Sequence, residues 1–234
     1  MSDLTLHFAP DTCARVTMIA LEEIGCPYNL KVVEFMRGEH RSPEYLALNP
    51  KGKVPTLVVD GKPLSENLAI LSYLHETYRE AHLLPEAGDV FTRAEILSDL
   101  SFCASGLHPI VTRLRLPRFF CDVEPGESRV FEMAETAMQL NFAIIEERLS
   151  ANTWWYGDRW SMLDAYINWV WFRVGGTRFD TSCFPNFARH GLEILERPSV
   201  ARALEIGRKV YADLENRGLA VKFDGPGAVN AAIR

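Results

Sequence analysis

The sequence lacks the features of a membrane-spanning or nucleic-acid-binding protein. Its 234 residues contain no run of about 18 apolar residues, the length that a bilayer span requires. Its 25 Lys and Arg against 31 Asp and Glu give a net charge of −6, so no basic excess indicates a face for nucleic acid. Residues 1–4 lack the basic and then apolar composition of a signal peptide. We therefore expect a cytoplasmic protein with no membrane or nucleic-acid partner.

Cysteine is scarce, and its spacing is irregular. The five cysteines are Cys13, Cys26, Cys103, Cys121 and Cys183. An odd number without a Cys-x-x-Cys pair is neither a disulfide framework nor a zinc-binding pattern. We therefore predict reduced thiols and no metal site, and we interpret four of the five as small buried apolar residues.

The first third of the chain alternates strand and helix patterns. Apolar residues alternate with polar ones over residues 4–8, which predicts a half-buried strand. A one-sided helix follows, which Gly25 is suited to end. Three more strands and two more helices are predicted at 28–35, 43–48, 56–59, 62–64 and 67–78, with Asp60-Gly61 as a hairpin turn. This order describes a small mixed-sheet α/β unit over residues 1–81.

The rest of the chain has helical spacing of its apolar residues. Residues 82–90, which contain Pro85 and Gly88, are typical of a linker. Helices are predicted at 91–120, 126–149, 161–175 and 199–217. The end of the chain from Lys222, with its Gly-Pro-Gly sequence, is expected to be irregular. The pattern therefore predicts an α/β domain, a linker over 82–90 and an all-helical domain over 91–234.

Four segments together resemble the cytosolic glutathione transferases, in particular the beta, zeta and theta groups. They are residues 11–13 (DTC), 44–57 (EYLALNPKGKVPTL), 64–70 (LSENLAI) and 157–164 (GDRWSMLD). The resemblance covers nearly the whole chain. It implies a thioredoxin-like N-terminal domain that binds glutathione as co-substrate, a C-terminal α-helical bundle domain that holds a second, partly apolar substrate, and a homodimer.

Two pairs of residues match the positions at which these transferases hold glutathione. The resemblance implies a cis bond between Val54 and Pro55, which would let the Val54 backbone pair with a bound peptide like an added strand. An ordinary trans bond is the alternative. Glu66 and Asn67 begin a predicted helix, where the N–H groups would bind the γ-glutamyl carboxylate and Glu66 its ammonium. Plain helix capping is the alternative there, since Ser65 and Asn67 are both good N-caps. The family usually has Ser or Thr at the position of Asn67.

The glycyl carboxylate of glutathione would need a cation. His40 and Lys53 match positions that theta-like members use, and Arg37 is an alternative cation. Lone basic residues in loops are as often merely solvated.

The residue that contacts the glutathione sulfur is Cys13 or Thr12. Cys13 falls where the first helix begins, and a helix N-terminus lowers the pKa of a thiol by stabilising its thiolate. Cysteine here resembles the beta and zeta groups. Thr12 could instead donate its hydroxyl hydrogen to the glutathione thiolate, and Cys13 could be purely structural.

His108 resembles a beta-group histidine that faces the active cleft. It could orient or protonate the second substrate, which we expect near His108 and residues 113–118, or it could be a hydrogen-bonded core histidine. Pro109 is expected to kink this helix.

Two other groups of residues have structural interpretations. Ser161 and Asp164 form a pattern like a capping box at the start of a buried helix. Packing is also expected for the five tryptophans, which are Trp154, Trp155, Trp160, Trp169 and Trp171.

The resemblance favours an enzyme that uses the thiol of glutathione on an electrophilic or disulfide substrate, assisted by Cys13. Transfer to carbon and monothiol exchange both fit. Zeta-like isomerisation is an alternative, weakened because Asp11-Thr12 replaces the usual double serine. A non-catalytic binding or regulatory protein of the same fold is the other alternative.

Overall fold

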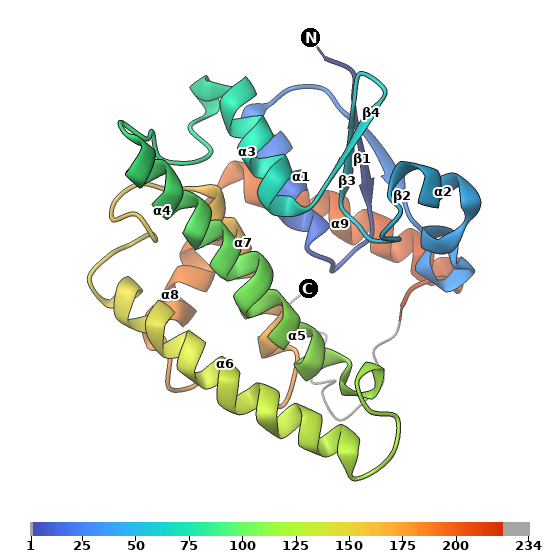
Figure 1. Cartoon of the computed structure of the whole chain (residues 1–234), viewed down its shortest axis with the longest axis vertical. Helices are drawn as coiled ribbons and strands as arrows, with labels where there is room; N and C mark the ends of the chain where they lie inside the picture. The colour runs from blue at the N-terminus through green and yellow to red at the C-terminus, as the bar shows by residue number, and fades with distance from the viewer. Residues whose placement is uncertain (1, 222–234) are drawn as a thin grey trace. The chain divides into compact units, whose positions relative to one another are not determined.

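The computed structural model describes residues 2–221, which form two compact units (Figure 1). Residues up to Leu84 and from Glu196 onward make up the first unit, and residues from Pro85 to Leu195 make up the second. The expectation for residues from Lys222 onward lies outside the described residues. None of the described helices is both long and apolar enough to span a membrane.

The first unit is built on a four-stranded mixed sheet in the order β2-β1-β3-β4. Its strands are β1 (Leu4–Phe8), β2 (Asn29–Val32), β3 (Thr56–Val59) and β4 (Lys62–Ser65). β1 pairs with β2 in parallel and with β3 antiparallel, and β3 pairs antiparallel with β4. Asp60 (φ 48°) and Gly61 (φ 80°) both adopt the positive φ of a tight hairpin turn, which confirms the predicted turn.

β2 is shorter than the predicted strand over 28–35. The chain leaves the sheet after Val32 and forms a 3₁₀ turn over Phe35–Arg37, which ends at Gly38 with φ 70°. The Glu34 N–H donates to the Glu39 carboxylate at 2.7 Å. Because this local bond satisfies a donor that a sheet would otherwise use, the strand ends early.

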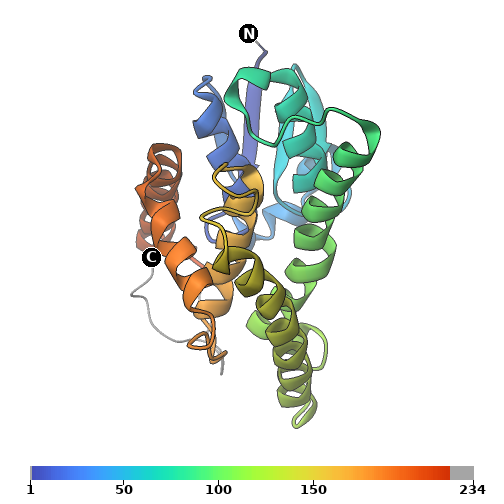
Figure 2. The same ribbon diagram turned by 90° about the vertical axis from the view of Figure 1, so that its left-hand side faces the viewer.

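Three helices follow the strands of this unit, and a fourth joins them from the end of the chain. They are α1 (Ala14–Ile24), α2 (Pro43–Leu48), α3 (Asn67–Thr77) and α9 (Pro198–Asn216). α1 ends at Gly25 with φ 72°, as predicted. α9 lies alongside α1 (Figures 1 and 2), where Arg197 pairs with Glu23 at 2.6 Å and Arg202 with Glu22 at 2.7 Å.

The long elements of the second unit are helices, and two isolated β-bridges, Trp154–Gly157 and Tyr156–Arg159, lie in the loop before the last two of them. The helical elements are α4 (Val90–Ser101), a π-helical segment (Phe102–Leu107), α5 (His108–Arg115), α6 (Gly126–Ser150), α7 (Met162–Gly175) and α8 (Pro185–Glu193). α8 was not predicted from the sequence. The predicted helix over 91–120 ends at Arg115 because the residue before a proline disfavours helical geometry, and Leu116, before Pro117, has φ −138°.

The distortion expected at Pro109 takes the form of the π-helical segment. Proline has no N–H and therefore cannot donate to the carbonyl four residues earlier. The His108 N–H donates instead to the Cys103 carbonyl, five residues back. The helical path thus continues from Val90 to Arg115 through a wider turn.

All five tryptophans contact other rings, which fits their predicted packing role. Trp155 and Trp169 are buried, and Trp171 stacks on Phe142 at 5.9 Å. The Trp155 indole N–H also donates to Asp99 Oδ2 at 2.9 Å, so its polar end is satisfied.

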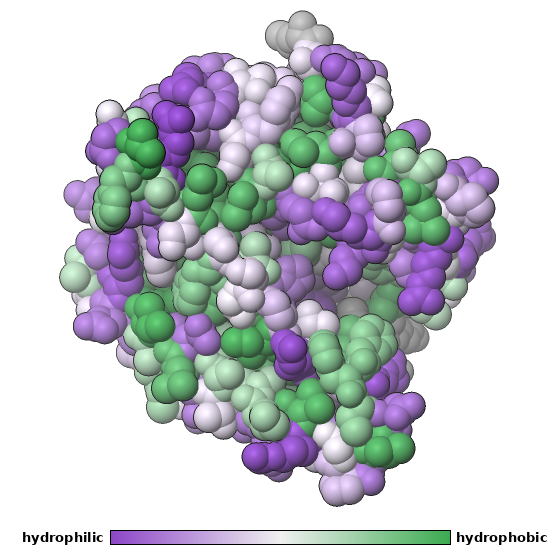
Figure 3. All heavy atoms as spheres, viewed as in Figure 1, coloured by the Kyte–Doolittle hydropathy of each residue, from purple (hydrophilic) through white to green (hydrophobic). Residues whose placement is uncertain are grey.

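Large apolar side chains are exposed on α4 and α6. On α4 they are Val90, Phe91 and Leu97; on α6 they are Met133, Leu140 and Ile144. The spacing of the three on α6 places them on one helical face, and Figure 3 shows hydrophobic residues at the surface over both helices.

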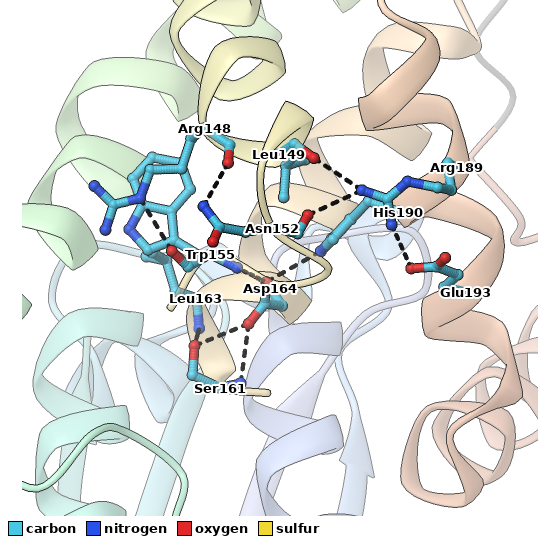
Figure 4. A network of polar contacts seen from close by, with 10 residues as sticks. All are labelled: Arg148, Leu149, Asn152, Trp155, Ser161, Leu163, Asp164, Arg189, His190 and Glu193. Atoms are coloured by element: carbon cyan, nitrogen blue, oxygen red, sulfur yellow. Dashed lines mark hydrogen bonds and ion pairs between the residues drawn. The ribbon is translucent and has the colours of Figure 1, made fainter. Parts of the chain in front are cut away.

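Asp164 accepts four hydrogen bonds inside the second unit (Figure 4). Its carboxylate accepts from the N–H of Trp155 at 2.8 Å, from the N–H and hydroxyl of Ser161 at 2.9 and 3.0 Å, and from His190 Nε2 at 3.1 Å. The Leu163 N–H in turn donates to Ser161 Oγ. This confirms the predicted capping box and extends it to Trp155 and His190, two partners that the sequence did not indicate.

Replacing Asp164 by alanine should lower the free energy of unfolding by about 3–5 kcal/mol, because the side chain is fully buried and its donors would lose their acceptor. Glu205→Ala is the control, because its pairs with Arg208 and Lys209 lie at the surface and should contribute less than about 1 kcal/mol. Urea unfolding at one protein concentration measures both. Equal losses in the two variants would contradict the structural role of Asp164.

Candidate functional site

Cys13 lies at the N-terminus of α1, beside the loop that precedes β3. It occupies the N-cap position, and its side chain makes no capping bond. The Cys13 Sγ donates to the Val54 carbonyl oxygen at 3.6 Å, and the residue is 8% exposed. The Val54–Pro55 peptide bond is cis, as the resemblance implied. The structure therefore brings the predicted thiol and the predicted peptide-docking residue together.

The Thr12 hydroxyl is engaged within its own loop. It donates to the Ala9 carbonyl at 2.7 Å and accepts from the Ala14 N–H at 3.3 Å. A hydroxyl has a single hydrogen, so in this arrangement Thr12 has none to offer a sulfur atom. This geometry favours Cys13 over Thr12 as the contact for a bound thiol.

Two side chains that were not predicted as site residues hold the loop before Val54 through hydrogen bonds. The Tyr45 hydroxyl and the Asn49 side-chain amide each donate to the Lys53 carbonyl at 2.7 Å. Both residues lie in the 44–57 segment that carries the resemblance. Among the described residues, no acceptor bonds to the Val54 N–H. A peptide lying against this loop would find that donor available.

Glu66 adopts an unusual backbone conformation at the start of α3. It is the N-cap of the helix with φ 77° and ψ 122°, a region that residues other than glycine rarely adopt and that is enriched at functional sites. Its side chain makes no capping bond, and neither Ser65 nor Asn67 occupies the N-cap position. The Glu66 carboxylate instead accepts from Lys51 Nζ at 2.7 Å. Glu66 therefore presents its carboxylate to a cation, and Lys51 is a partner that the sequence did not indicate.

Asn67 turns its side chain into the protein. Its Nδ2 donates to the Cys13 carbonyl at 3.0 Å, and its Oδ1 accepts from the buried Thr17 hydroxyl at 2.7 Å. The side chain thus ties the start of α3 to the start of α1. The Asn67 backbone N–H, at the first position of α3, is the group left to meet an anion.

The basic residues predicted for the glycyl carboxylate differ in their surroundings. His40 packs edge-on against Phe35 at 4.7 Å, and its buried Nδ1 has no hydrogen-bond partner among the described residues. Burial, with a smaller effect of Arg41, lowers the pKa of His40. Lys53 is exposed and forms no ion pair within the described part of the chain, whereas Arg37 pairs with Glu34 at 3.2 Å. Lys53 is thus the best placed of the three to meet a carboxylate.

His108 lies in the second unit within an aromatic cluster. Its Nδ1 is 3.4 Å from the hydroxyl of Tyr166, and its ring meets Trp169 at a centroid distance of 4.6 Å. Both neighbours are buried. In the range 2–221, no group of three His, Cys, Asp or Glu side chains is arranged to hold a metal ion.

Comparisons with known proteins identify the family. A model of the glutathione S-transferase N-terminal domain matches residues 2–76. Glutathione S-transferase GST-4.5 of Xanthomonas campestris pv. campestris is 32% identical over 166 residues, which cover 70% of this chain and 79% of that protein. Maleylacetoacetate isomerase of Pseudomonas aeruginosa is 34% identical over 154 residues, which cover 64% of this chain and 70% of that protein.

The fold is shared with solved transferases as well. A crystal structure of a glutathione transferase homologue from Sulfitobacter with bound glutathione superposes with a TM-score of 0.76 at 26% identity, covering 94% of this chain and all of that one. The chain belongs to the glutathione S-transferase family.

The side chain of Asn67 should contribute to stability. Asn67→Ala should lower the free energy of unfolding by about 2 kcal/mol, because the buried Thr17 hydroxyl and the Cys13 carbonyl would each lose a partner. Asn29→Ala removes an exposed asparagine of the same unit and should cost less than about 0.5 kcal/mol. Thermal or urea unfolding compares the two. A loss no larger than that of the control would show that the bridge contributes little.

Proposed function

We propose that this protein is an enzyme that binds reduced glutathione in its first unit and uses the thiol on a second substrate. The observation that carries the proposal is the position of Cys13, whose sulfur lies 3.6 Å from the Val54 carbonyl at the start of a helix. A peptide paired with the Val54 backbone would bring its own sulfur to that place.

The three parts of glutathione would meet three different groups. The cysteinyl part would pair with the N–H and carbonyl of Val54. The γ-glutamyl zwitterion would place its carboxylate on the Asn67 backbone N–H at the start of α3 and its ammonium on Glu66. Lys53, with His40 beside the same loop, would meet the glycyl carboxylate. The side chain of Asn67 would support this site from behind rather than touch the ligand.

Two reactions suit a cysteine at the N-terminus of α1. In transfer, the glutathione thiolate attacks an electrophilic carbon, and Cys13 hydrogen-bonds to that thiolate. In exchange, the Cys13 thiolate attacks a glutathionyl mixed disulfide and releases the other thiolate. A second glutathione thiolate then attacks the Cys13 adduct, which yields glutathione disulfide and regenerates Cys13.

Isomerisation is the second candidate. It is favoured by the 34% identity with maleylacetoacetate isomerase of Pseudomonas aeruginosa. The loop before Cys13 weakens this candidate, because the Thr12 hydroxyl donates its hydrogen to the Ala9 carbonyl.

The second substrate would bind to the helical part of the chain. The proposed division assigns glutathione to residues 1–81, a linker to 82–90 and the second substrate to 91–234, near His108 and residues 113–118. The aromatic cluster of His108, Tyr166 and Trp169 offers apolar surface together with a titratable group. We place the protein in the cytoplasm, since a reduced Cys13 and reduced glutathione need a reducing compartment.

Glu66→Ala should weaken the binding of glutathione about tenfold, because the ammonium would lose its carboxylate. Glu76→Ala is the control: Glu76 is exposed on the same helix, where it pairs with Arg79. Titration calorimetry measures affinity, and glutathione-dependent turnover measures activity. Binding without turnover on any thiol or electrophile would favour the non-catalytic alternative, and no binding by the unmodified protein would contradict the proposal.

Exposure to glutathione disulfide should distinguish exchange from transfer. If Cys13 is the exchanging thiolate, peptide-mapped mass spectrometry should find a glutathionyl adduct at Cys13 that forms faster than one at the exposed Cys183. The adduct should disappear on addition of reduced glutathione. A folded protein modified only at Cys183 would contradict exchange and leave Cys13 a role in transfer.

We further propose that two copies of the chain form a homodimer through α4 and α6. Support comes from their exposed apolar residues, because such patches on soluble proteins commonly mark interfaces. Light scattering should give about twice the chain mass of 26.5 kDa, as a two-fold dimer requires. Leu140→Glu should shift the protein toward the monomer. Leu192, on α8, is as exposed as Leu140, so Leu192→Glu is the control and should leave the mass unchanged. A monomeric unmodified protein would refute this proposal.

A further inference from the structure

Lys51 forms a contact that the proposed function does not explain. Its Nζ donates to Glu66 Oε1 at 2.7 Å and to the Ser65 hydroxyl at 3.0 Å. The Glu66 carboxylate is the group proposed to hold the ammonium of glutathione. The ammonium of Lys51 therefore already neutralises the carboxylate that the ligand's ammonium would use, through one of its two oxygens.

Both members of this pair are held by their backbones. The Lys51 N–H donates to the side-chain oxygen of Asn49 at 3.2 Å, and Asn49 is itself buried and bonded to Lys53 and Thr56. Glu66 is oriented by its positive φ at the start of α3. The pair thus joins two ordered segments, the loop before β3 and the N-terminus of α3.

The side chains remain free to separate. They are 51% and 61% exposed, and the flexible stem of a lysine lets its ammonium move into water. Exposed ion pairs are weak, so an incoming cation can replace Lys51 at a small cost.

We propose that Lys51 is the resident cation of Glu66 and that the ammonium of the ligand competes with it for the carboxylate. This inference rests on the proposed function. It assigns Lys51 to specificity: the residue neutralises Glu66 in the ligand-free protein and reduces the advantage of a ligand that carries an ammonium over one that does not. Removing Lys51 should therefore increase affinity for glutathione, the reverse of what loss of an ordinary ligand contact would do.

The test compares two ligands and two variants by titration calorimetry. The ligands are glutathione and its desamino analogue, which has hydrogen in place of the α-amino group. Lys51→Met should bind glutathione about two- to fivefold more tightly than the unmodified protein. It should not gain affinity for the analogue, which has no ammonium to compete. Lys62→Met, which removes an exposed lysine from β4 of the same unit, controls for the lost charge and should gain affinity for neither ligand.

Unchanged or weaker glutathione binding by Lys51→Met would overturn the inference while leaving the proposed function intact. An equal gain for both ligands would also overturn it, because the effect would then not concern the ammonium. No binding of glutathione by the unmodified protein would overturn the proposed function itself. Circular dichroism verifies folding, and Lys51→Gln provides a second variant should the methionine variant misfold.

Discussion

The candidate site depends on one buried hydrogen bond, from the side-chain amide of Asn67 to the carbonyl of Cys13 at 3.0 Å. It joins the N-termini of two helices whose residues are far apart in the sequence. Thr17 completes the bridge by donating to the same amide. Because both ends are buried, losing either would leave an unsatisfied polar group, so the two helix starts are held in one arrangement. That arrangement sets the distance between the Cys13 thiol and the N-terminus of α3.

Around this bridge, the site is built largely from backbone groups. The Val54 N–H and carbonyl follow a carbonyl, that of Lys53, which accepts hydrogen bonds from Tyr45 and Asn49, and the Asn67 N–H is placed by the start of α3. Backbone groups can recognise a peptide whatever occupies the nearby side chains. In the proposed function, the side chains of Cys13, Glu66 and Lys51 then select the peptide and the chemistry.

The sequence predicted the order of elements well, because the apolar periodicity of β1, α1, α6 and α7 is strong. It did not predict the contacts that join residues far apart in the sequence. Helix-capping preference made Asn67 a candidate for capping or for ligand contact, yet its partner Thr17 lies 50 residues earlier and left no local signal. The contact between α9 and α1 through Arg197 and Glu23 was not predicted either, because these residues are also far apart in the sequence.

Local patterns failed in other ways too. Pro109 predicted a distortion of the helix, but it did not predict that the distortion would be a π-helical segment before it. α8 was missed because its nine residues are too few to show a clear period. Lys51 stood inside a recognised segment, but only the fold brings it to Glu66.

Binding of glutathione along Val54 and the start of α3 can be tested by amide chemical-shift mapping during a titration of the ¹⁵N-labelled protein with glutathione. The backbone N–H signals of Val54 and Asn67 should shift most, because each would gain a hydrogen bond to the ligand. Shifts that are absent, or that are confined to residues 85–195, would contradict it.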